Sequence, residues 1–125
     1  MVVGIGIDVV ETERLTRALS AHGHRFEEQV FTPGELADSA TRRDRTDALA
    51  ARFAAKEACL KALSMGLFDG ASLRQAEIVS CDSGAPELRL TGTLAERARR
   101  RGVRSIYVSL THERGIAAAV VVLEA

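Results

Sequence analysis

The segments of this chain that are expected to be strands do not alternate regularly with those expected to be helices. Glycine, proline and β-branched residues divide it into a strand, three helices, two strands, a helix and two strands. Strands that follow one another directly pair as antiparallel hairpins, whereas regular alternation builds a parallel sheet. The sequence therefore predicts an α+β fold in which a small antiparallel sheet packs on a long central helix. Because 125 residues suit one domain, we expect a single domain over residues 1–125.

The expected boundaries follow from caps, breakers and periodicity. The expected strands cover residues 2–10, 76–81, 87–90, 103–111 and 116–123, and the expected helices cover residues 11–20, a segment starting after Thr32, residues 47–64 and residues 93–101. The residues Thr32-Pro33-Gly34-Glu35 predict a capping box with proline at the first helical position.

The first strand has two unlike faces, since successive side chains point to opposite sides. Val3, Ile5, Ile7 and Val9 alternate with Gly4, Gly6 and Asp8. We expect the branched residues to face the core. The glycine face is then a bare floor that a backbone or a ligand can approach, and it ends in a carboxylate.

The last strand is apolar on both faces. A chain of this size can rarely cover both sides of a strand. We therefore expect one side to form a subunit interface.

Composition excludes several classes of protein. Seventeen basic residues balance 17 acidic ones, which argues against a dedicated nucleic-acid binder. Cys59 and Cys81 form no CxxC motif, so they indicate free thiols rather than a zinc site. We find no signal peptide and no apolar run that would span a membrane, and expect a cytoplasmic protein.

The long helix over residues 47–64 contains the only two lysines of the chain. Lys56 falls inside a stripe of leucine and phenylalanine, Glu57 lies at its edge, and Lys61 is one turn beyond Glu57. Lys56 alone is explained as well by a side chain that extends its amine to the surface. Glu57 and Lys61 alone are explained as well by an exposed helix pair worth about 0.3 kcal/mol.

Asp8 gives this helix a chemical interpretation. Two carboxylates, Asp8 and Glu57, without histidine or cysteine form an oxygen site of the kind that Mg²⁺ prefers, with water and phosphate oxygens completing its shell. We expect the flanking lysines to face phosphate. A divalent ion and cations around a phosphate are what phosphoryl transfer requires. His112, at the end of a strand, is either part of this site or incidental. The pair Gly4-x-Gly6 lacks the third glycine of a dinucleotide fingerprint.

Four stretches together resemble one known family. GIGIDVVE, ARFAAKEACLKAL, GAPELRLTG and VSLTHERGIAAAVV are similar, in this order and over nearly the whole chain, to the holo-acyl-carrier-protein synthase family of 4′-phosphopantetheinyl transferases. The resemblance implies that family's fold and the transfer of phosphopantetheine from coenzyme A to a serine of an apo acyl carrier protein, a step of fatty-acid or other lipid biosynthesis. It also implies Mg²⁺ and a homotrimer with active sites between subunits.

The resemblance assigns roles by position. It implies Asp8 and Glu57 as metal ligands, Lys61 beside the diphosphate and His112 near the phosphates or the reacting group, so that Glu57, Lys61 and His112 are the expected catalytic residues. The further residues expected along the cofactor are Arg43, Arg45 and Arg52 on the nucleotide side, Ser64 and Gly66 after the long helix, and Gly84 and Pro86 in a turn. Ser64-Met65-Gly66 departs from the family's commoner Gly-Thr-Gly.

Arg14, Arg17 and Arg25 match the region that the family uses to dock its acidic carrier. A solvated helix face is the alternative for these arginines. Two other functions remain open at this point, a Mg²⁺-dependent hydrolase of nucleotide pyrophosphates and a non-catalytic module that binds coenzyme A or a carrier. The base that takes the serine proton also remains open between a water on the metal, Glu57 and another carboxylate.

Overall fold

The computed structural model describes residues 1–125 except for the side chain of Leu67. Its elements are β1 (Val2–Glu11), α1 (Thr12–His22), α2 (His24–Val30), α3 (Pro33–Ala40), α4 (Arg45–Ala62), two 3₁₀ helices (Leu67–Asp69 and Leu73–Gln75), β2 (Ala76–Ser80), β3 (Pro86–Leu90), α5 (Gly92–Arg100), β4 (Ser105–Glu113) and β5 (Ile116–Glu124). The predicted α+β class with antiparallel pairing is confirmed.

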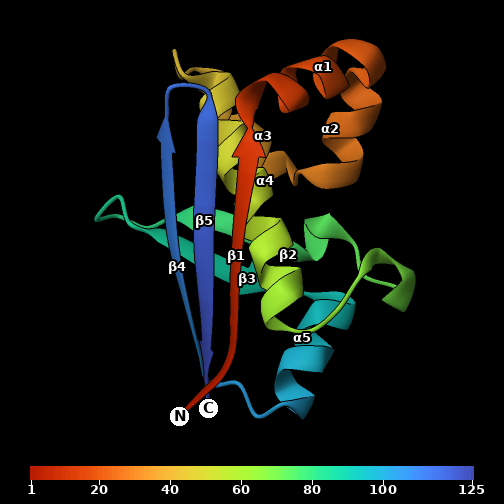
Figure 1. Cartoon of the computed structure of the whole chain (residues 1–125), viewed down its shortest axis with the longest axis vertical. Coiled ribbons are helices and arrows are strands. Elements are labelled where there is room, and N and C mark those ends of the chain that lie inside the picture. Colours follow the sequence, from red (N-terminus) through yellow and green to blue (C-terminus); the bar gives the residue numbers. More distant parts are fainter.

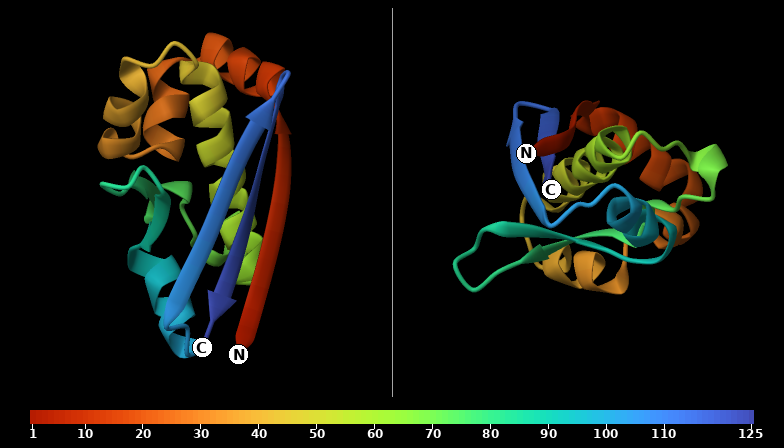
Figure 2. Two further views of the ribbon diagram at one scale, coloured as in Figure 1. Left: turned by 90° about the vertical axis from the view of Figure 1, so that its left-hand side faces the viewer. Right: turned by 90° about the horizontal axis from the view of Figure 1, so that it is seen from below.

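The strands form two sheets rather than one. β5 lies between β1 and β4 and pairs antiparallel with both, while β2 and β3 form a separate antiparallel ribbon (Figure 1). Helix α4 lies between the three-stranded sheet and the ribbon, as Figure 2 shows. It is the central helix that the sequence predicted, and 12 of its 18 residues are buried.

The orientation of β1 is the reverse of the one predicted. The glycine face packs directly on α4, where a Cβ atom on Gly6 would overlap the carbonyl oxygen of Ala58. Ile5, Ile7 and Val9 point away from the helix and are 66%, 63% and 60% exposed. The prediction that the branched residues face the core is wrong for these three in the single chain, because at Gly4 and Gly6 the helix leaves no room for a Cβ atom. Val3, at the start of the strand, is partly buried against the core. The close approach of another backbone is confirmed.

The exposed side of β1 continues across the sheet. On β5, Ala117, Ala119, Val121 and Leu123 are buried against α4, whereas Ala118, Val120 and Val122 are only half-buried. We call the side formed by Ile5, Ile7, Val9, Ala118, Val120 and Val122 the outer sheet face. The subunit interface expected there stays a prediction.

Lys56 does not face a phosphate, nor does its amine reach the surface. It is fully buried, with its Nζ 2.6 Å from Oε1 of the equally buried Glu35. The amine also donates hydrogen bonds to the carbonyl oxygens of Leu73 at 3.0 Å and Ala76 at 2.8 Å. The expectation that both lysines face phosphate is therefore wrong for Lys56, which joins α4 to α3 and to the start of β2. Glu35 is also the residue of the predicted capping box, which is confirmed.

One helix was missed. α2 has only seven residues, too few for a periodic pattern, and Gly23 with φ of 54° separates it from α1. α2 brings the ring of Phe26 to within 6.5 Å of that of Phe53 on α4, measured between centroids. Both cysteines are free. Among the described residues, no helix combines the length and apolar character that crossing a membrane requires.

Candidate functional site

Asp8 and Lys61 meet where β1 passes over α4. Asp8 shares the face of β1 that carries Gly6, so its carboxylate points toward the helix. Lys61 Nζ lies 3.2 Å from Asp8 Oδ1 and donates a hydrogen bond to the carbonyl oxygen of Ile7 at 3.0 Å. The Asp8 side chain is mostly buried, whereas that of Lys61 is 57% exposed. The close packing of Gly6 on α4 thus brings a carboxylate and an exposed cation together at the surface.

Glu57, one turn before Lys61, completes this group. Partial burial raises the pKa of the Glu57 carboxyl, repulsion by the Asp8 carboxylate raises it further, and Lys61 opposes both effects. Two carboxylates that repel each other at the surface form a place where a cation is stabilised. We call Asp8, Glu57 and Lys61 the carboxylate group.

The carboxylate group fits one kind of metal ion. No cluster of three or more histidine, cysteine or acidic side chains occurs in the described part of the chain, which argues against a site built wholly from protein ligands. Two carboxylates match a hard cation such as Mg²⁺ that keeps water and takes its other oxygens from a substrate phosphate.

A second group of predicted residues surrounds a cavity of about 180 Å³. Arg52, Gly84, Pro86 and His112 line it, from α4, the turn between β2 and β3, and the end of β4. We call this space the arginine cavity. Arg52 is 95% buried, since its exposed fraction is 5%, and its Nε has no hydrogen-bond partner among the described atoms. Burial disfavours the charged form of Arg52 and so lowers its pKa. An anion bound beside the guanidinium would offset this cost through charge-assisted hydrogen bonds.

Arg42 also lines the arginine cavity, and the sequence analysis missed it. Three arginines stand close together at 42, 43 and 45, and only the geometry of the turn before α4 distinguishes them. Arg45 forms an ion pair with Glu27 at 2.7 Å, and Arg43 is exposed outside the residues that line the cavity. The expectation that Arg43 and Arg45 contact a phosphate stays a prediction.

The carboxylate group and the arginine cavity lie on different edges of the sheet. Asp8 is on β1 and His112 is on β4, and β5 runs between these two strands. Ser64 and Gly66 follow the end of α4, beyond Lys61, and Ser64 has a left-handed φ of 55°. Within a single chain, the predicted residues therefore form two separate sets, one at the carboxylate group and one at the arginine cavity, rather than one site.

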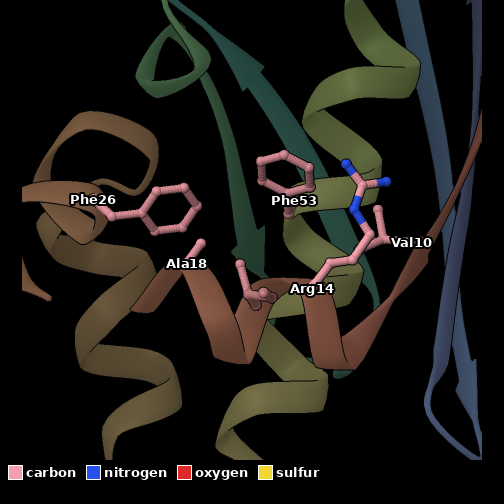
Figure 3. Close-up of a pocket in the computed structure, with 6 residues that line it drawn as sticks. Val10, Arg14, Ala18, Phe26 and Phe53 are labelled. Carbon is pink, nitrogen blue, oxygen red and sulfur yellow. The ribbon is translucent and has the colours of Figure 1, made fainter. Parts of the chain in front are cut away.

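A third feature adjoins the predicted docking arginines. A cavity of about 160 Å³ opens between α1, α2 and α4, with Leu15, Ala18, Phe26 and Phe53 in its apolar wall. In Figure 3 the side chain of Arg14 extends along this cavity toward β1 and α4. Arg17 and Arg25 are exposed on α1 and α2. The apolar wall was not predicted, because Phe26 lies in the helix that the sequence analysis missed.

Comparison with known proteins identifies the family of this chain. A sequence model of the 4′-phosphopantetheinyl transferase superfamily matches residues 4–121. The holo-[acyl-carrier-protein] synthase of Maridesulfovibrio salexigens is 45% identical over 124 residues, which cover 99% of each chain. The crystal structure of the holo-[acyl-carrier-protein] synthase from Neisseria meningitidis has a TM-score of 0.91 at 32% identity and covers 100% of both chains. The Helicobacter pylori synthase in complex with coenzyme A has a TM-score of 0.85 at 31% identity, covering 96% of this chain and 99% of that one.

These alignments cover nearly the whole length of this chain and of each relative. They include the strand with Asp8, the helix with Glu57 and Lys61, and the strand β4 with His112 near its end. Sequence identity and fold thus lead to the same assignment as the four motifs. The chain belongs to the holo-acyl-carrier-protein synthase family of the 4′-phosphopantetheinyl transferase superfamily.

Proposed function

We propose that this protein transfers 4′-phosphopantetheine from coenzyme A to a serine hydroxyl of an apo acyl carrier protein and releases adenosine 3′,5′-bisphosphate. The observation that carries the proposal is the meeting of Asp8, Glu57 and Lys61 at the surface. The names of the relatives and the coenzyme A complex of the H. pylori synthase support it. Such a reaction would serve lipid biosynthesis in the cytoplasm.

Asp8 and Glu57 would hold Mg²⁺, which when bound would neutralise charge on the diphosphate of coenzyme A. Lys61 is exposed enough to leave Asp8 and donate to an oxygen of the diphosphate, where it stabilises the negative charge that develops on the leaving phosphate. Glu57 would lie beside the diphosphate in this arrangement, and it is the chain's own candidate to receive the proton of the attacking serine.

The adenosine part of coenzyme A would occupy the arginine cavity of a neighbouring copy. The outer sheet face supports this arrangement, because three branched residues of β1 are more than half exposed there. Large exposed apolar patches mark interfaces. We propose a homotrimer in which the carboxylate group of one subunit and the arginine cavity of the next form one site.

The carrier protein would dock on α1 and α2. Arg14, Arg17 and Arg25 present positive charge to an acidic helix, and the cavity beside Phe26 offers a place for an apolar side chain. Reversing the charge of Arg14 and Arg17 should raise the KM for the carrier severalfold and leave that for coenzyme A unchanged. Equal effects on both substrates would argue against docking there.

Intact-mass analysis tests the reaction itself. Apo carrier protein incubated with coenzyme A, Mg²⁺ and this protein should gain the mass of one phosphopantetheine. Little adenosine 3′,5′-bisphosphate should appear when the carrier is omitted. Its release without a carrier would instead identify a pyrophosphate hydrolase, and binding of coenzyme A without release would identify a non-catalytic module.

A further inference from the structure

Asp44 places a carboxylate beside two of the nitrogen-bearing side chains that line the arginine cavity, Arg42 and His112. Arg42 donates two hydrogen bonds to it, from Nε to Oδ1 at 2.8 Å and from Nη2 to Oδ2 at 3.0 Å. His112 Nε2 lies 3.5 Å from Oδ2 on the other side. This paired geometry is the one in which a guanidinium also binds phosphate.

The side chain of Asp44 does not cap the helix that begins after it. It occupies the N-cap position of α4, where an aspartate side chain usually accepts a hydrogen bond from a backbone N–H of the first turn. Here its side chain makes no cap hydrogen bond and turns instead toward Arg42 and His112. The carboxylate therefore contacts two residues that line the cavity instead of capping α4.

The buried guanidinium of Arg52 is less well partnered among the described atoms. Arg52 is buried, donates from Nη1 to the carbonyl oxygen of Ala48 at 3.2 Å, and leaves Nε without a partner among the described atoms. An anion that enters the cavity therefore meets the buried Arg52, whose Nε is free among the described atoms, and also Arg42 and His112, which a carboxylate already contacts.

We infer that Asp44 is an internal counter-anion that competes with a phosphate monoester of the nucleotide for Arg42 and His112, and so sets how strongly the cavity prefers nucleotides that carry this extra phosphate. The inference rests on the proposed function for the identity of the nucleotide. Asp44 is 36% exposed, so its side chain has room to turn outward when a phosphate replaces it.

Removing the charge of Asp44 should strengthen binding of the phosphate. Exposed ion pairs are weak, and nearby like charges in water repel by a similar amount. We therefore expect Asp44→Asn to bind adenosine 3′,5′-bisphosphate about three- to tenfold more tightly than the unchanged protein. Binding of adenosine 5′-monophosphate, which lacks the second phosphate, should change less than twofold.

The measurement is calorimetric titration of the whole protein with each nucleotide at low ionic strength, which does not depend on catalysis. Glu96→Gln is the matched control, because Glu96 is also a surface carboxylate that pairs with an arginine, Arg100, but it lies on α5. The control should bind both nucleotides as the unchanged protein does. Equal tightening for both nucleotides, no tightening, or weaker binding in Asp44→Asn would overturn the inference. Tightening specific to the bisphosphate in a protein that transfers nothing to a carrier would support Asp44 and refute the proposed function.

Discussion

The buried pair of Lys56 and Glu35 leads to a prediction about stability. Both side chains are fully buried and lie 2.6 Å apart. Burial lowers the pKa of Lys56, and the Glu35 carboxylate opposes that effect. Replacing Lys56 with methionine keeps a similar volume but removes the positive charge, so the carboxylate stays buried without its counter-ion.

The expected loss follows from the contacts that remain. The Glu35 carboxylate keeps hydrogen bonds from the backbone N–H groups of Thr32 at 2.9 Å and Ile78 at 3.0 Å, while two backbone carbonyl oxygens lose the lysine donor. Breaking a buried pair by removing one partner destabilises proteins by about 3–5 kcal/mol. The two retained bonds favour the lower end, so we expect about 3 kcal/mol, a large share of the roughly 5–15 kcal/mol that stabilises a domain.

Urea unfolding followed by circular dichroism measures this loss. Lys61→Met is the matched control on the same helix, because Lys61 is exposed and its pair with Asp8 should contribute less than about 1 kcal/mol to stability. The control should unfold nearly as the unchanged protein does but lose most of its activity. The double variant Lys56→Met/Glu35→Gln should recover part of the loss, since it leaves no buried charge unpaired.

The reasoning would be refuted if Lys56→Met lost no more stability than Lys61→Met. It would also be refuted if the double variant lost as much as the sum of Lys56→Met and Glu35→Gln measured separately, because that result would mean that the two groups do not interact.

Three further predictions concern the carboxylate group and the outer sheet face. Gly6→Ala should lower the free energy of unfolding by several kcal/mol, on the order of an overpacked core, and reduce activity, because the added methyl group meets the Ala58 carbonyl; thermal unfolding and a transfer assay check this. Glu57→Gln should lower Mg²⁺-dependent turnover at least about tenfold yet raise the Tm of the metal-free protein, since it removes repulsion from Asp8. That gain in Tm should be full above the raised pKa of Glu57 and disappear at pH below the ordinary glutamate value, where the wild-type carboxyl is protonated whether folded or unfolded. Ile7→Arg should leave the fold intact but lower the molar mass in light scattering, and an unchanged mass would place the subunit interface elsewhere.

The sequence predicted well what depends on neighbouring residues. The capping box at Thr32 and Glu35 formed as expected, because its hydrogen bonds close within one turn. The glycines of β1 correctly indicated a close backbone approach. The motif residues Asp8, Glu57 and Lys61 do lie together, since strand alternation and helical periodicity aim their side chains to the same side.

What the sequence could not predict depends on distant partners. Alternation gives β1 two faces but does not say which face this chain covers, and the branched face was assigned wrongly because apolar residues usually lie inside. A helical wheel places Lys56 in an apolar stripe without showing that Glu35 lies opposite. Among the arginines before α4, only the three-dimensional turn shows that Arg42 rather than Arg43 lines the cavity.

The backbone contact between Gly6 and α4 affects how the enzyme tolerates amino-acid substitutions. Side chains usually set the spacing between packed elements, so substitutions in a core shift those elements slightly. Here the main chain of β1 rests on the main chain of α4 at Gly6, so no side chain sets the spacing between the strand that carries Asp8 and the helix that carries Glu57. Substitutions elsewhere in the interior can accumulate without altering the gap in which an ion would be held.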